Sequence, residues 1–258
     1  MTIPTRRADR LAALAGPRRR PRRHGPETGG RSTIRPFEPP TRPPESEPDP
    51  SRMDLIDISR SVAPSTAVWP GDQSVTHSWT SRLKAGGSVN LSALSLSLHT
   101  GTHVDAPYHV AEEGRTTDAL PLSAFVGPCV VVDTSGASTI RPEHLPARPH
   151  AKRVLFKTRA SDVPDEEWPS EIVPVASKTA QALTTREAVL LGTDNPSVDP
   201  EDSTELDAHH ALRRAGIVHL EGLSLSGVEP GQYQLLALPL KIPDADAAPV
   251  RAVLAPAV

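Results

Sequence analysis

Residues 97–109 contain the sequence SLHTGTHVDAPYH, which places three histidines and one aspartate within eleven positions. The stretch before it, residues 94–98, alternates apolar and polar residues with the period of a half-buried strand. If this alternation continues, one face of the strand carries His99, Gly101, His103 and Asp105. We therefore predict one extended strand through this stretch, with the leucines buried and the imidazole and carboxylate side chains on the opposite face.

Imidazole and carboxylate groups on one surface form a ligand set for zinc or a similar divalent ion. In a flat strand the Cα atoms of His99 and His103 would stand about 13 Å apart, near the limit for sharing one ion. The chain must therefore bend between them, and Gly101 permits a bulge or kink. Histidines that merely face solvent or a polar core are the alternative, but this combination of residues favours a metal site.

The first 52 residues differ in composition from the rest of the 258-residue chain. They hold twelve of the 28 Lys and Arg residues, all of them arginine, six of the 31 Asp and Glu residues, and eleven of the 29 prolines. The segment thus carries a net charge of +6 and the remainder −9. Because apolar periodicity is nearly absent, the segment cannot bury enough surface to offset its chain entropy. We predict a disordered extension at 1–52 and one domain at 53–258.

The arginine-rich extension allows three interpretations: a transit peptide, a nucleic-acid-binding tail, or an extension ahead of the natural start. Met53 opens the first strand-like run, which favours the third. The acidic body argues against a nucleic-acid partner, and no apolar run is long enough to span a membrane. The single cysteine, Cys129, lies in an apolar run and cannot form an internal disulfide. This fits a reducing compartment and a cytoplasmic location, with Cys129 as a small buried side chain.

Short apolar runs predict more strands than helices in the body of the chain. Strands are expected at 53–62, 130–133, 154–157, 188–194 and 217–223, with two more near the C-terminus. Helices are expected at 177–186, with Ala180 and Leu183 on the inner side, and at 206–216, ended by Gly216. This pattern predicts a single α/β domain with a mixed β-sheet and few helices.

Three groups of residues outside the central stretch have a possible functional role. Glu221 is an acid in an apolar strand, where a carboxylate needs a partner or a metal ion. A histidine to accompany it could be His209, His210 or His219, and periodicity alone does not choose among them. Trp69, in a Pro-Gly loop, is either a core aromatic or the wall of a pocket.

Other candidates are given structural roles. Asp194 and Asp199 stand beside prolines in a turn and are expected to act as caps rather than as ligands. Trp168 is expected to be exposed and without function.

Taken together, these motifs resemble the metal-dependent cyclase/amidohydrolase family, which includes the bacterial kynurenine formamidases. The resemblance covers residues 53 to about 256. It rests on the histidine-aspartate stretch, on Trp-Pro-Gly-Asp at 69–72 and on Asp-x-Pro-Ser-Val-Asp at 194–199. It implies a swivelling β/β/α fold, a homodimer and the hydrolysis of N-formyl-L-kynurenine to L-kynurenine and formate. Val110 departs from the family pattern, which usually has a bulky aromatic there.

The resemblance also implies a role for each site residue. It implies two divalent ions, with zinc expected before manganese or cobalt. In the family pattern His99 and His103 bind the first ion, a helix histidine at His209 binds the second, and Asp105 and Glu221 touch both. His109 becomes a proton shuttle rather than a fourth ligand, and Trp69 contacts the substrate.

Two alternatives to this function are kept. The first is a related enzyme that opens a cyclic amide such as isatin. The second is a metal-binding or nucleic-acid-binding protein without turnover. A serine-based mechanism has no support, since the chain lacks a Gly-x-Ser-x-Gly motif.

Overall fold

The protein is described here by a computed structural model, which covers residues 54–146 and 151–257. These residues belong to one compact unit. The predicted extension at 1–52 and the proposed start at Met53 lie outside the described residues, so both remain predictions.

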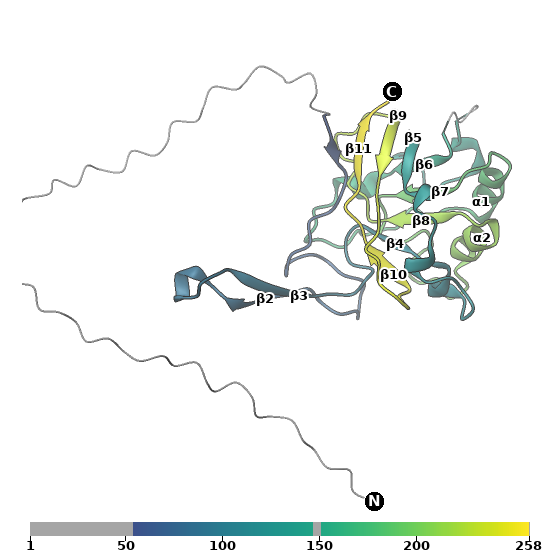
Figure 1. The fold of residues 1–258 in the computed structure, drawn as a ribbon. Coiled ribbons are helices and arrows are strands. Elements are labelled where there is room, and N and C mark those ends of the chain that lie inside the picture. Colours follow the sequence, from purple (N-terminus) through teal and green to yellow (C-terminus); the bar gives the residue numbers. More distant parts are fainter. Residues whose placement is uncertain (1–53, 147–150, 258) are drawn as a thin grey trace, which may run out of the picture. The chain divides into compact units, whose positions relative to one another are not determined.

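A nine-stranded sheet forms the centre of the described chain (Figure 1). Its order is β1-β11-β9-β5-β6-β7-β8-β4-β10. The neighbours from β5 to β8 are parallel, and all other pairs are antiparallel. The predicted single α/β domain with a mixed sheet is therefore confirmed. The bounds are β1 (Ile56–Asp57), β4 (His103–Asp105), β5 (Val126–Asp133), β6 (Arg153–Lys157), β7 (Leu190–Thr193), β8 (Val218–Glu221), β9 (Gly231–Leu236), β10 (Ala247–Pro249) and β11 (Val253–Pro256).

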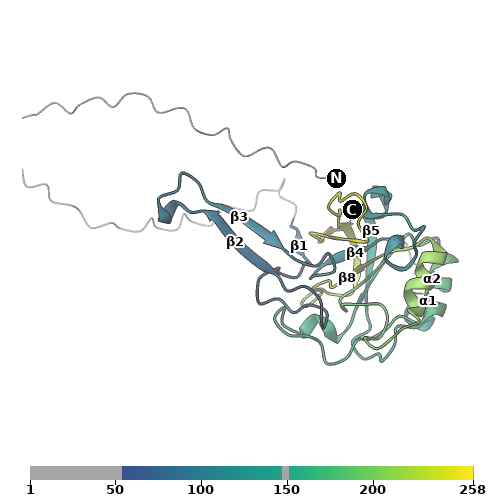
Figure 2. The same ribbon diagram turned by 90° about the horizontal axis from the view of Figure 1, so that it is seen from below.

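Two α-helices, α1 (Ser177–Thr184) and α2 (Asp207–Ala215), lie side by side (Figures 1 and 2). Leu183 of α1 and Leu212 of α2 share a buried cluster with Phe156 of β6 and Leu191 of β7. The predicted inner side of α1 is confirmed, since Ala180 and Leu183 are buried. Short 3₁₀ helices connect the other elements: η1 (Leu83–Ala85), η2 (Pro107–Val110), η3 (Thr117–Ala119), η4 (Leu122–Ala124), η5 (Pro142–His144) and η6 (Arg159–Asp162).

A separate hairpin of β2 (Thr76–Ser81) and β3 (Leu91–Ser95) corrects the prediction of one strand from Leu94 to Asp105. Of the alternating leucines only Leu94 belongs to β3, and it is 53% exposed. Leu96 and Leu98 follow the strand and are half-buried. The chain then turns, with Gly101 in the left-handed region at φ 67°, and pairs again only from His103. The predicted bend at Gly101 is present, but it separates strands of two different sheets. An alternation of apolar and polar residues predicts a strand, but it does not show whether another part of the protein covers its apolar face.

Two further boundaries differ from the predictions. Beyond Asp57 the first strand keeps only an isolated bridge at Ser59, because the backbone N–H of Arg60 donates to the side chain of Thr102. The C-terminal region forms three strands, β9 to β11, rather than two.

Cys129 is fully buried, as predicted, and burial raises the pKa of its thiol to about 12. No helix in the described part of the chain is both long and apolar enough to cross a membrane.

The turn that contains Gly101 packs against the end of β8 through a second glycine. Gly222 has φ 63°, and a Cβ atom at this position would lie 2.2 Å from the carbonyl oxygen of Gly101. Only glycine fits both the positive φ and the close approach. This contact holds the turn that carries His99 against the strand that carries Glu221.

Replacing Gly222 by alanine should therefore destabilise the protein by about 2–4 kcal/mol, since it adds a backbone clash to an unfavourable φ. Urea unfolding measures the effect. Gly136→Ala is the matched control, because a Cβ atom there meets nothing within 4 Å and its φ is not positive. Equal stabilities for the two variants would contradict this account of the turn.

Candidate functional site

Two adjacent strands of the sheet supply four side chains of the site. β4 and β8 pair antiparallel in a register that places His103 opposite Glu221 and Asp105 opposite His219. Directly opposed residues of an antiparallel pair share one face and lie close together. The intervening pair, Val104 and Leu220, points to the other face and is fully buried in the core.

Two more histidines approach these strands from outside. His99 lies in the turn before β4, and its Nδ1 is 3.1 Å from Oδ1 of Asp105. Its ring centroid is 5.1 Å from that of His103. His209, in the first turn of α2, places its Nε2 3.4 Å from Oδ2 of Asp105 and 3.6 Å from Oε1 of Glu221. The structure thus brings together all five predicted ligands: His99, His103, Asp105, His209 and Glu221.

The two carboxylates divide the cluster into two halves. Oδ1 of Asp105 faces His99 and His103, whereas Oδ2 faces His209. Glu221 repeats this division, since Oε2 lies 3.3 Å from Nε2 of His103 and Oε1 faces His209. Each carboxylate therefore presents one oxygen to each half.

Several buried atoms of the cluster have no hydrogen-bond partner among the described residues. They include Nε2 of His103 and both carboxylate oxygens of Asp105. Unsatisfied buried polar atoms are costly, and such a group indicates an ion or other ligand. Tetrahedral ligands of zinc at about 2.0–2.1 Å stand about 3.3 Å apart, close to the separations of 3.3–3.6 Å in the cluster. The residues present therefore fit a metal ion.

The charges of the cluster lead to the same conclusion. Burial disfavours the charged imidazole of His103, but the carboxylates of Asp105 and Glu221 outweigh it and raise its pKa to about 10. Burial opposes charging at His209 as well, yet Asp105 and Asp199 beside it raise its pKa to about 10. Burial would raise the pKa of Asp105, but the surrounding histidines hold it well below the usual value. The site thus stabilises positive charge between its carboxylates, as a cation site must.

His109 lies at the edge of this cluster, in η2 after Pro107. Its side chain is 30% exposed, with Nε2 3.8 Å from Oδ2 of Asp105. Nδ1 lies 3.6 Å from Oδ2 of Asp246, and burial lowers the pKa of His109. The ring is therefore close to the cluster while remaining in contact with solvent.

Two aspartates that sequence reasoning did not assign to the site position its histidines. Asp246 lies 2.9 Å from Nε2 of His99, and no motif indicated it in its acidic turn. Asp199, expected to be structural, accepts hydrogen bonds from the backbone N–H groups of Ala208 and His209. It therefore caps α2 as predicted, but it also lies 2.6 Å from Nδ1 of His209. Carboxylates that bond the far nitrogen of a histidine fix its orientation.

A cavity of about 300 Å³ opens on the cluster and is lined by His99, His109 and two tryptophans. Trp69, the predicted substrate contact, is half-buried in its wall. The prediction that Trp168 is exposed is wrong: it is also half-buried, lines the same cavity and packs edge-to-face on Trp69 with the ring centroids 5.5 Å apart. Sequence distance concealed this pair, because the two rings meet only in the folded chain.

Comparisons with known proteins identify relatives of this chain. The family model described as "Putative cyclase" matches residues 56–200. The chain is 59% identical over 206 residues to a kynurenine formamidase of Salinibacter ruber (strain DSM 13855 / M31), covering 78% of this chain and 97% of that protein. It is 42% identical to a kynurenine formamidase of Erythrobacter litoralis (strain HTCC2594), covering 79% and 94%.

Solved structures with a similar fold include a predicted metal-dependent hydrolase from Bacillus stearothermophilus. It is 30% identical, with a TM-score of 0.67 over 79% of this chain and 98% of that one. A potential metal-dependent hydrolase with cyclase activity is 29% identical, with a TM-score of 0.68 over 80% of this chain and all of the other. Isatin hydrolase A from Ralstonia solanacearum shares the fold at 22% identity, with a TM-score of 0.69 over 80% and 92%.

Asp199→Ala should destabilise the metal-free protein by about 2 kcal/mol, because two backbone N–H groups of α2 lose their acceptor. Asp199→Asn keeps one acceptor oxygen and should cost less. Urea unfolding of chelator-treated protein gives both values. The control is Asp202→Ala, an exposed residue of the same loop. An unchanged stability in Asp199→Ala would show that α2 does not depend on this cap.

Proposed function

The chain belongs to the cyclase family, and from this membership and the geometry of the site we propose that it hydrolyses N-formyl-L-kynurenine to L-kynurenine and formate. One observation carries the proposal above the others. This chain is 59% identical to a kynurenine formamidase, and it has a buried cluster of histidines and carboxylates beside a cavity lined by two tryptophans.

We propose that this cluster holds two divalent ions, with zinc expected first and manganese or cobalt as alternatives. His99 and His103 would bind the first ion, and His209 the second. Asp105 and Glu221 would each give one carboxylate oxygen to each ion, because the two oxygens of each carboxylate face different halves of the cluster. Ions held there would lower the pKa of a water molecule and polarise the formyl carbonyl.

The chain's own residues supply the remaining chemistry. His109, near the cluster and partly exposed, would accept the proton of the attacking water and deliver it to the leaving aniline nitrogen. The oxygen of the water would first bond to the formyl carbon, and the carbon–nitrogen bond would then break as His109 protonates the nitrogen, which releases formate and the free amine. Trp69, with Trp168 packed against it, would hold the aryl ring of the substrate.

We further propose a homodimer in the cytoplasm, without a nucleic-acid or membrane partner. A two-stranded hairpin is marginal in water by itself. The β2–β3 hairpin nevertheless exposes apolar side chains, with Trp79 42%, Leu91 56% and Leu94 53% exposed. A second copy of the chain could cover them. The single buried cysteine supports a cytoplasmic location. The acidic body of the chain argues against a nucleic-acid partner.

The first experiment measures turnover of N-formyl-L-kynurenine by the purified protein, together with its metal content. Removal of metal with a chelator should abolish turnover, and returning zinc, manganese or cobalt should restore it. Isatin is assayed in parallel, because the isatin hydrolases resemble this chain in fold at 21–23% identity. Turnover of isatin but not of the formamide would overturn the proposed substrate.

His109→Ala should retain both ions and lose about 10²–10⁴-fold in kcat, the usual contribution of a positioned proton-transfer group. Elemental analysis and steady-state kinetics measure the two effects separately. His144→Ala, in η5 away from the cluster, serves as the control variant. Normal turnover by the His109 variant would rule out the proton-shuttle role, whereas loss of metal would make His109 a ligand.

A further inference from the structure

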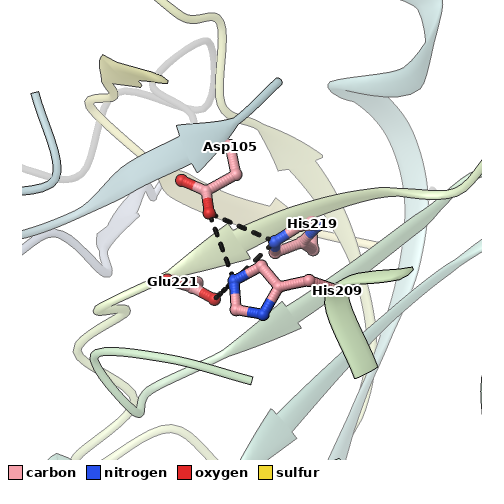
Figure 3. Close-up of side chains that lie close together, drawn as sticks. All are labelled: Asp105, His209, His219 and Glu221. Atoms are coloured by element: carbon pink, nitrogen blue, oxygen red, sulfur yellow. Dashed lines mark ion pairs between the residues drawn. The ribbon is translucent and has the colours of Figure 1, made fainter. Parts of the chain in front are cut away.

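A further histidine, His219, lies beside His209 in the half of the cluster that Oδ2 of Asp105 faces. It stands on β8, two residues before Glu221 and directly opposite Asp105, so it shares the face of the sheet that carries the ligands. The family resemblance selected only His209 to accompany Glu221 in this part of the site. Figure 3 shows both histidines directed at the same two carboxylates.

The distances place the two histidines in equivalent positions. Nε2 of His219 lies 3.4 Å from Oδ2 of Asp105 and 3.7 Å from Oε1 of Glu221. Nε2 of His209 lies 3.4 and 3.6 Å from the same two oxygens. The rings meet edge-to-face at 5.1 Å. Two nitrogens and two oxygens therefore surround one point, and a single ligand atom from each of the four residues lies within 4.8 Å of the others.

The burial of His219 calls for a partner at this nitrogen. The residue is 7% exposed, and its Nε2 has no hydrogen-bond partner among the described residues. A histidine retained only for packing would be expected to satisfy a buried ring nitrogen. Here that nitrogen is directed at the carboxylate oxygens that have the same need.

We propose that His219 is a ligand of the second ion. This inference rests on the proposed function and adds a residue to its metal site. Each ion would then take two imidazoles and one oxygen from each bridging carboxylate: His99 and His103 in one half, His209 and His219 in the other. The strand register supplies the physical basis, because it sets His219 opposite Asp105 as it sets Glu221 opposite His103.

The test counts metal ions in His219→Leu, which fills a similar volume without a ligand atom. After dialysis against a graded metal buffer, elemental analysis should show one ion retained and the other bound at least about 100-fold more weakly. The loss of residues that merely orient a ligand already costs 10- to 100-fold in affinity. His210→Ala is the matched control, because it removes the neighbouring histidine of α2, which is not part of the cluster. Two ions bound to His219→Leu with the affinity of the unmodified protein would overturn the proposal.

A second measurement keeps the test decisive if the leucine variant does not fold. The unmodified protein, labelled with ¹⁵N-histidine, is titrated with zinc and followed by long-range proton–nitrogen NMR. Nε2 of His219 should shift to the metal-bound range together with Nε2 of His209. A shift at His209 without one at His219 would refute the assignment.

The NMR signal of Nε2 of His219 reports on that nitrogen alone, so it decides the role of His219 whether the protein binds one ion or two. It is also independent of turnover. If the protein binds zinc through His219 but does not hydrolyse N-formyl-L-kynurenine, the proposed substrate is wrong and the assignment of His219 as a metal ligand stands.

Discussion

The antiparallel pairing of β4 with β8 is the constraint on which the rest of the site depends. Its register sets His103 against Glu221 and Asp105 against His219, and it sends Val104 and Leu220 into the core. A slip of one residue would reverse these faces, burying the charged groups in the apolar layer and exposing the apolar pair. The hydrophobic effect that favours this register therefore also brings the polar side chains of the two strands together on the opposite face.

His99 and His209 are positioned by contacts outside this strand pairing. His99 is carried by a turn that requires a left-handed glycine at Gly101 and the absence of a Cβ atom at Gly222. His209 is carried by the first turn of α2, where Asp199 accepts two backbone N–H groups and holds the imidazole through Nδ1. A carboxylate near a helix N-terminus is favoured by the helix dipole as well. One aspartate thus joins helix capping to the orientation of a site residue.

Much of this arrangement could be predicted from the sequence, because it depends on local spacing. The histidine-aspartate stretch indicated the cluster, and the glycine within it indicated the bend. The family pattern selected His209 as the histidine that accompanies Glu221, because periodicity alone did not distinguish His209, His210 and His219.

What the sequence could not supply depends on contacts between distant segments. The alternation before His99 predicted a half-buried strand that continues to Asp105, but the structure ends β3 at Ser95 and pairs it in an exposed hairpin. No local pattern shows whether another surface covers such a strand. Trp168 joins Trp69 across about a hundred residues, and Asp246 reaches His99 across 147. His219 shares its strand face with Glu221, yet only the register with Asp105 shows that its nitrogen meets the same oxygens.

The charge of the cluster links the site to the stability of the fold. Two buried carboxylates on neighbouring strands repel each other, and moving each from water is costly without a compensating cation. In the metal-free chain His103 and His209 supply that charge, because the neighbouring carboxylates raise the pKa of each imidazole to about 10. Divalent ions in the same place would release those protons and bind only the folded register. Binding of this kind adds its free energy to folding, and it would stabilise most strongly the pairing of β4 with β8 that creates the site.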